Sequence, residues 1–279
     1  MKAILFIYAL SSPFPEPLQS LINAERNFAQ LSIDVNTRHA FVSNMNEKSI
    51  VFQKGEPLNG LNTWSGYEAD NNYLFWWPEY ADIASSGDFG YTTGPAEFGG
   101  ERDNPKPVGG IYYSTVWKKN QEGEWKIVVD MGSAKYTPGS PKVDVKSTAY
   151  PLLPVNKVLN VDNEKSTLLD LDKNYLNKLN EAGKSVLSSY FHIEGRIHHG
   201  GQDPVTNFEL IRSFKEPGHF SFQQLGGDMA SSADMGFTYG KVDLVREKEG
   251  AKQTLHLNYI RVWKKYNGEW KIVLDVVGG

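Results

Sequence analysis

The chain opens with a helical spacing of apolar residues and then changes to alternation. Apolar side chains recur every three or four positions between residues 18 and 29, which predicts a helix that begins near Pro15 and Pro17. A second, short helix is expected at about residues 37–44, after a break at Asn36, a residue type that tolerates left-handed backbone. From residue 49 onward apolar positions alternate with polar ones, as in strands that bury one face.

The second half of the chain is expected to contain the same elements in the same order. A helix should follow a Ser166-Thr167 cap, with a break at Gly183 and a short helix at about residues 184–190. This order of helices and strands predicts an α+β fold with helices on one face of a mostly antiparallel sheet. A third short helix is expected in each half, near residues 61–67 in the first and 207–214 in the second. Strands are expected at 49–52, 76–84, 89–98, 111–119, 125–130 and 195–198.

Three blocks of sequence return at a spacing of 145 or 146 residues. Segments 84–91, 117–119 and 123–130 recur as 230–237, 263–265 and 268–275, in the same order, which indicates a duplicated domain. We expect a first domain at 16–132, a Pro-containing linker at 133–165 and a second domain at 166–279. The two copies are expected to pack as an intramolecular pseudo-dimer through the outer faces of their sheets, with the lysine pairs at 118–119 and 264–265 in solvent.

Composition and charge exclude several classes of function. The chain of 279 residues has no cysteine, which excludes disulfides, thiolate catalysis and cysteine-ligated zinc. Its net charge of −4 argues against a nucleic-acid partner, because phosphate binding requires a concentrated basic surface. The sequence has no phosphate-binding glycine loop, dinucleotide fingerprint or serine nucleophile elbow, so we expect no cofactor.

The first eleven residues have the features of a minimal export signal. Lys2 precedes eight apolar residues, and Ala9-Leu10-Ser11 forms a small-x-small cleavage site. This pattern favours a periplasmic or secreted protein, and the apolar run is too short to span a membrane. The alternative is a cytoplasmic protein whose first residues form an extra strand or a tail.

Several motifs together resemble the nuclear transport factor 2-like superfamily, and within it the SnoaL-like and calmodulin-kinase-association-like domains. They are Glu25-Arg26-Asn27-Phe28-Ala29, Ser86-Gly87-Asp88-Phe89-Gly90-Tyr91, Val116-Trp117-Lys118 and Trp125-Lys126-Ile127-Val128. The resemblance covers nearly all of residues 18–132 and also residues 168–279. It implies two cystatin-like cones, each a curved sheet wrapped around about three helices with an apolar cavity at the open end. The superfamily includes isomerases, dehydratases, epoxide hydrolases, cyclases and non-catalytic binders, so the fold does not select a function.

In the second copy, Asp172 lies on the apolar stripe of the predicted helix. Strand alternation places Tyr259 and Arg261 on one face, where Arg261 is expected to reach Asp172. His198 aligns with Phe52, a core-like position, and is expected to face the same cone. The catalytic hypothesis is proton transfer, in which Arg261 holds Asp172 ionised, Tyr259 donates to an oxyanion and His198 is a further base. The alternative is a sealed ion pair that only supports the fold.

In the first copy, Glu25 occupies the equivalent position on the apolar stripe, and aromatic residues are more numerous than in the second. We expect Glu25, Trp64, Trp76 and Tyr113 to bind a flat apolar ligand. The alternative is that the rings fill the core and that Glu25 is a buried carboxylate with hydrogen-bond partners.

Histidines are concentrated in the second copy and raise the hypothesis of a metal site. His192, Glu194, His198 and His199 are close in sequence, but adjacent residues of a strand point to opposite faces, so we expect no metal.

The sequence leaves three functions open. The first is a tandem-cone binder of a small apolar or amphipathic molecule, and the second is an isomerase, cyclase or dehydratase that uses a cavity carboxylate or histidine. The third is an interaction module whose cones are filled.

Overall fold

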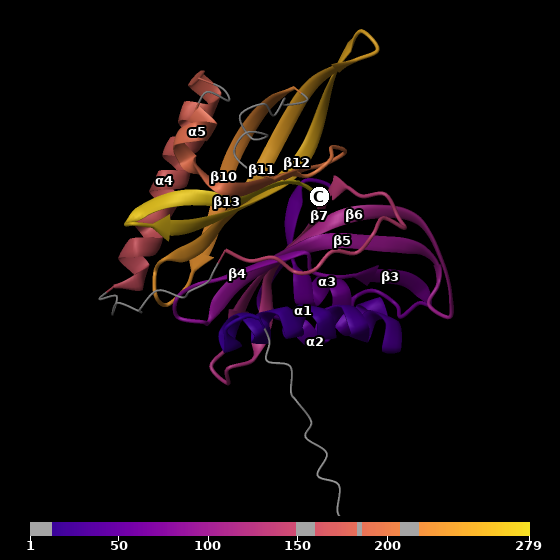
Figure 1. Ribbon diagram of the computed structural model, residues 1–279. Helices are drawn as coiled ribbons and strands as arrows, with labels where there is room; N and C mark the ends of the chain where they lie inside the picture. Colours follow the sequence, from indigo (N-terminus) through magenta and orange to yellow (C-terminus); the bar gives the residue numbers. More distant parts are fainter. Residues whose placement is uncertain (1–12, 149–159, 183–185, 207–217) are drawn as a thin grey trace, which may run out of the picture.

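Two sheets, each with its own helices, make up the part of the chain that the structure describes. The structure is a computed structural model and describes residues 13–148, 160–182, 186–206 and 218–279. Figure 1 shows the first domain from indigo to magenta, with its helices beneath a curved sheet, and the second from orange to yellow. The α+β fold class and the tandem arrangement expected from the sequence are confirmed.

The first domain begins with helices and continues with a meander of strands. The helices are α1 (Glu16–Asp34), α2 (Thr37–Asn44) and α3 (Gly60–Ser65). The sheet has the strand order β2-β1-β7-β6-β5-β3, with β4 paired to β5, and among the described strands of this first sheet only β1 and β7 pair in parallel. The strands are β1 (Met45–Gln53), β2 (Glu56–Asn59), β3 (Asn72–Trp76), β4 (Tyr80–Ile83), β5 (Phe89–Glu101), β6 (Asn104–Lys119) and β7 (Trp125–Lys135).

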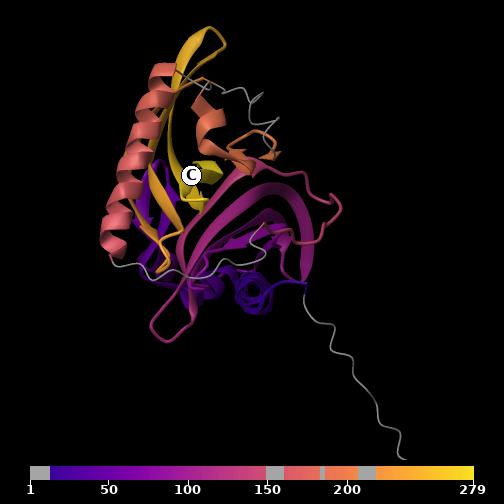
Figure 2. The same cartoon turned by 60° about the vertical axis from the view of Figure 1, so that its left-hand side comes forward.

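The second domain repeats this plan in its described part. Helices α4 (Val161–Ala182) and α5 (Leu187–Tyr190) precede a sheet with the order β10-β11-β12-β13-β8-β9, in which β8 and β13 are parallel. Figure 2 shows α4 lying along one face of this sheet. The strands are β8 (Phe191–His199), β9 (Val205–Thr206), β10 (His219–Met229), β11 (Met235–Lys248), β12 (Ala251–Tyr266) and β13 (Glu269–Gly278).

Local sequence signals explain most element boundaries. Helix α1 starts directly after Pro15, its N-cap, has Pro17 in its first turn, where a proline ring is tolerated, and buries the apolar stripe. The hairpin between β12 and β13 turns at Asn267 and Gly268, both with positive φ, as a two-residue hairpin turn requires. Asn36 is extended and caps α2 by accepting a hydrogen bond from the His39 N–H, so the expected left-handed backbone there is wrong.

Some boundaries differ from expectation for identifiable reasons. Helix α4 begins at Val161, because the Asn160 side chain accepts from the Asn163 N–H, and the expected Ser166-Thr167 cap lies inside the helix. The Ser166 and Thr167 hydroxyls instead bond to carbonyls four residues earlier. Of the expected strand at 76–84, only Tyr80–Ile83 forms a strand, β4, while Trp76 is the last residue of β3. The elements leave residues 136–160 between the domains, while the predictions for residues 1–11, 184–185 and 207–214 lie outside the described residues.

The two domains pack against each other through a shared apolar layer. Residues on the outer faces of both sheets form one buried cluster, as expected for an intramolecular pseudo-dimer. Its buried members are Tyr80, Ala84, Phe89, Tyr91, Val116, Val129 and Met131 from the first domain and Ala230, Met235, Phe237, Ile260, Val262, Val273, Leu274 and Val276 from the second.

Polar contacts across this interface follow a pseudo-twofold axis. Ser86 and Ser232, equivalent residues 146 positions apart, bond to each other at 2.9 Å. Lys118 binds Asp228 at 2.8 Å, and its equivalent Lys264 binds Asp82 at 2.6 Å. The expectation that these lysines lie in solvent is therefore wrong, because each pairs with a carboxylate of the other domain.

We expect Lys264→Met to destabilise the interface more than Lys118→Met. The Lys264–Asp82 pair is nearly enclosed, with side-chain exposures of 11% and 0%, whereas both partners of the Lys118–Asp228 pair are 34% exposed. Removing Lys264 leaves Asp82 buried without its cation, which costs about 2 kcal/mol, against about 0–1 kcal/mol for the exposed pair. Urea denaturation of both variants tests this, and equal losses would contradict it.

Candidate functional site

Two carboxylates lie close together inside the first domain. Glu25 comes from the apolar stripe of α1 and is 0% exposed. Its carboxylate accepts hydrogen bonds from the indole nitrogens of Trp76 at 2.6 Å and Trp117 at 2.9 Å, and from the Thr92 hydroxyl. Burial raises the pKa of Glu25 to about 7, although the three hydrogen bonds lower it.

Asp130 is the second carboxylate, and unlike Glu25 it is partly exposed. It lies on β7 opposite Thr115 of β6, whose hydroxyl donates to it at 2.6 Å. Burial raises the pKa of Asp130 to about 6. The negative charge of Asp130 in turn contributes to the raised pKa of Glu25. The pair can therefore hold or exchange protons close to neutral pH.

A cavity of about 190 Å³ opens beside Asp130. Strand β1 and helix α3 bring aromatic and aliphatic side chains to it, with two polar groups among them. These walls are Val51, Phe52, Gln53, Thr63, Trp64 and Tyr67, and the lining is completed by Met131 and Gly132 of β7 and by Gly279, which follows β13 of the second domain. A carboxylate beside aromatic walls is the arrangement expected of a site for a small amphipathic molecule.

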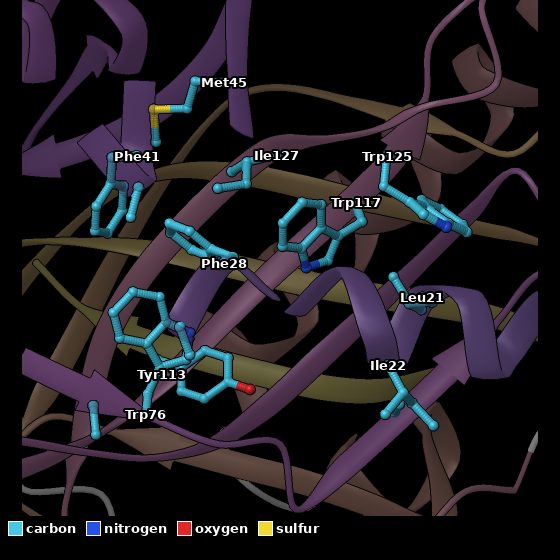
Figure 3. Close-up of a cluster of buried hydrophobic side chains, with 14 of the residues drawn as sticks. Leu21, Ile22, Phe28, Phe41, Met45, Trp76, Tyr113, Trp117, Trp125 and Ile127 are labelled. Atoms are coloured by element: carbon cyan, nitrogen blue, oxygen red, sulfur yellow. The ribbon is translucent and has the colours of Figure 1, made fainter. Parts of the chain in front are cut away.

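Of the four residues expected to bind a ligand in the first domain, Trp64 lines the cavity and the other three do not. Trp64 lines the cavity and stacks on Phe41 with ring centroids 3.8 Å apart. Trp76 and Tyr113 are buried in the core, where Trp76 contacts Phe28, as Figure 3 shows. Glu25 is bonded to the indoles of Trp76 and Trp117 in the core and does not line the cavity.

In the second domain, Asp172, Arg261 and Tyr259 lie together as expected. Arg261 donates to Asp172 at 2.6 Å, and the Tyr259 hydroxyl donates to the same carboxylate at 2.9 Å. Gln224 adds a third hydrogen bond at 2.8 Å. Asp172, Arg261 and Tyr259 are each 0% exposed.

A second carboxylate completes this group. Asp275 accepts from the Arg261 Nε at 2.9 Å and contacts the His199 ring nitrogen at 3.3 Å. Burial raises the pKa of Asp275, but the Arg261 charge and the hydrogen bond with His199 outweigh it, so the net pKa is lowered. Burial acts in the opposite direction on Arg261, and the two carboxylates keep its pKa raised. The arrangement is an enclosed ion-pair group in which one guanidinium binds two carboxylates.

His198 lies on the other side of β8, away from this group. Its ring contacts the Thr93 hydroxyl at 3.3 Å and packs against Tyr112, both in the first domain. Burial and the nearby Arg196 lower its pKa to about 3, so it is neutral at physiological pH. The alignment with Phe52 was right, but both residues face the interface between the domains, and His199 is the histidine beside Asp275.

Asp130 is the site residue that the sequence analysis did not select. The signal was present, because Asp130 and Asp275 end the same repeated block. Its partner position on the neighbouring strand is Thr115 in the first copy and Arg261 in the second. Reading these strand pairs together identifies a pair of carboxylates in each domain.

No group of three or more histidine, aspartate or glutamate side chains with the placement of a metal site occurs among the described residues. His198 and His199 point to opposite faces of β8, as alternation in a strand requires. Within the same ranges, no helix is long and apolar enough to cross a membrane.

Comparisons with known proteins give similarity at the level of solved structures. No protein-family model matches the chain, and no curated protein matches its sequence. A nuclear transport factor 2-like superfamily protein from Salmonella enterica is similar with 16% identity and a TM-score of 0.37, over 43% of this chain and 93% of that one. A ketosteroid isomerase-like protein from Erwinia carotovora is similar with 12% identity and a TM-score of 0.36, over 42% and 95%.

A third solved structure is described as a protein of unknown function from Shewanella oneidensis with a nuclear transport factor 2-like fold. It has 15% identity and a TM-score of 0.33, over 41% of this chain and 98% of that one. Each match spans about the length of one repeat. The structures to which this chain is similar are thus nuclear transport factor 2-like and ketosteroid isomerase-like proteins, and the chain itself has a tandem two-sheet architecture.

Proposed function

We propose that the first domain binds a small amphipathic molecule in the cavity beside Asp130. The observation that supports this most directly is that Asp130, a partly exposed residue, lines a cavity whose walls include Trp64 and Tyr67. Aromatic walls supply apolar contact area, and the carboxylate accepts a hydrogen bond from a polar end of the ligand.

The size of the cavity limits the ligand. A volume of about 190 Å³ is below the roughly 300–1,000 Å³ of pockets that enclose drug-sized ligands. It is above the roughly 150 Å³ that suffices for benzene in an apolar protein cavity. We therefore propose a ligand of about one ring with a short polar substituent, or the end of a longer molecule.

The second domain offers less support for binding. Asp172 and Arg261 satisfy each other's charge without exposed surface, which favours the fold-supporting alternative. The catalytic role of Asp172, Arg261 and Tyr259 stays a prediction, whereas His198 lies apart from them at the interface between the domains.

An isomerase, cyclase or dehydratase activity is the second candidate function. The observation that favours it is the accessibility of Asp130 together with a pKa near 6, which suits a general base. Deuterium uptake from D₂O into the α-position of a small ketone tests it, and uptake that is unchanged in Asp130→Asn would exclude Asp130 as the base.

We expect Trp64→Ala to weaken binding of benzyl alcohol, a probe of the proposed size, by about tenfold. The substitution removes a wall of the cavity, and full burial of an aromatic contact contributes on the order of 1–3 kcal/mol. Saturation-transfer NMR with titration measures the affinity. Trp270→Ala, a partly buried tryptophan of the second domain, is the matched control.

Unchanged affinity in Trp64→Ala, or an equal loss in Trp270→Ala, would contradict binding in this cavity.

Export is a separate proposal, because its signal lies in residues 1–11, outside the described part of the chain. Mass spectrometry of the protein recovered from the periplasm and from the culture fluid tests this proposal. We expect a molecular mass lower by that of about eleven residues.

A further inference from the structure

The two domains differ in the side chain that binds their paired carboxylates. In the second domain, Asp172 and Asp275 both bind Arg261, so the cation comes from the chain itself. In the first domain, Glu25 and Asp130 hold the corresponding places, and Thr115 replaces the arginine. Among the described residues, no lysine, arginine or histidine forms an ion pair with Glu25 or Asp130, and no cation is among the principal causes that shift the pKa of either.

The surroundings of Arg261 show what this fold places around a cation. Its guanidinium lies 4.6 Å from the centre of the Tyr175 ring and 4.8 Å from that of Tyr259. Aromatic faces attract cations, and two carboxylates pair with this guanidinium. The first domain has the carboxylates, and Trp64 and Tyr67 supply aromatic rings at the cavity beside Asp130.

We infer that the ligand of the first domain is a small ammonium compound, whose cationic nitrogen pairs with Asp130 while its apolar part packs on Trp64 and Tyr67. This inference rests on the proposed binding function of the cavity and adds the charge of the ligand to it. The ligand nitrogen supplies the cation that Arg261 supplies in the second domain.

Electrostatics favour this charge over the alternatives. Asp130 is a partly buried carboxylate with Thr115 as its hydrogen-bond donor, so much of the water that would stabilise its charge is displaced. A cation relieves that cost, a neutral hydroxyl relieves part of it, and an anion increases it. Glu25 behind Asp130 acts in the same direction, because any charge it carries is also negative.

The experiment compares three probes of nearly equal size at pH 7.5: benzylamine, benzyl alcohol and benzoate. We expect benzylamine to bind at least tenfold more tightly than benzyl alcohol, and benzoate to bind more weakly than either. Asp130→Asn should reduce the affinity for benzylamine to that for benzyl alcohol and leave the alcohol almost unaffected. Glu101→Gln, which removes an exposed carboxylate of the same domain, is the control and should leave all three affinities unchanged.

The outcomes separate this inference from the function on which it rests. If none of the probes binds with contacts to Trp64, the proposed cavity function fails. If benzyl alcohol binds there as tightly as benzylamine, or if Asp130→Asn keeps the preference, the cavity function stands and the ammonium inference is overturned. Asp130→Ser is a second uncharged variant without added volume, for use if Asp130→Asn melts early.

Discussion

Arg261→Met is expected to lower the free energy of unfolding of the second domain by about 3–5 kcal/mol. The methionine keeps most of the volume of the side-chain stem, but Asp172 and Asp275 lose the cation that both of them bind. Asp172 is 0% exposed and Asp275 4%, so water replaces the lost partner poorly. Urea denaturation followed by far-ultraviolet circular dichroism measures the loss.

The cause of this loss is tested by removing the charges as well. Asp172→Asn and Asp275→Asn combined with Arg261→Met should recover a large part of the stability, because no buried charge then remains unpaired. Thr115→Ser in the first domain is a matched control on the equivalent strand, since it keeps a hydroxyl for Asp130. A small loss for Arg261→Met alone would show that the ion-pair group is hydrated and open.

Glu25→Gln is expected to change how stability depends on pH. Folding raises the pKa of Glu25 from about 4.5 to about 7, so its protonated form favours the folded state. This contribution is fully present below pH 4.5 and is lost as the pH rises through 7. It amounts to about 3 kcal/mol, since each pKa unit corresponds to about 1.4 kcal/mol. Relative to the variant, the unmodified protein should therefore lose about 3 kcal/mol between pH 4.5 and 8.

The comparison with the variant is needed because other groups titrate in the same range. Asp130 acts in the same direction as Glu25, whereas His198, whose pKa is lowered to about 3, adds stability as the pH rises to 6.5. The glutamine leaves one indole N–H without an acceptor, a cost that does not vary with pH. A difference between the two proteins that is constant from pH 4.5 to 8 would contradict the raised pKa of Glu25.

Element order and duplication were predictable from the sequence, because both depend on local patterns. The spacing of apolar residues predicts α1, the Asn267-Gly268 pair predicts a tight hairpin, and the repeated blocks predict a second copy of the sheet. The Asp172–Arg261–Tyr259 group was also predictable, since helical and strand periodicity each place these side chains on an inner face.

The rest depends on contacts that local patterns do not contain. An inner face of a sheet and an outer face that packs on another domain are equally apolar, so His198 was assigned to the wrong face. The importance of Asp130 depends on a cavity formed by α3 and β1, more than sixty residues away in sequence. Lys118 and Lys264 have the sequence context of solvated turns, and only the docking of the two sheets gives them partners.

The pseudo-twofold interface has a consequence for how the two halves can change. In a homodimer of identical subunits, every substitution appears on both sides of the axis, so a residue such as Thr115 and its counterpart must remain the same. Joining the copies in one chain removes that constraint: Lys264 is enclosed where Lys118 is open, and Arg261 stands where the first copy has Thr115. The second half can then hold its inner carboxylates in an ion pair with Arg261, while in the first half Asp130 is held by the Thr115 hydroxyl in place of a cation.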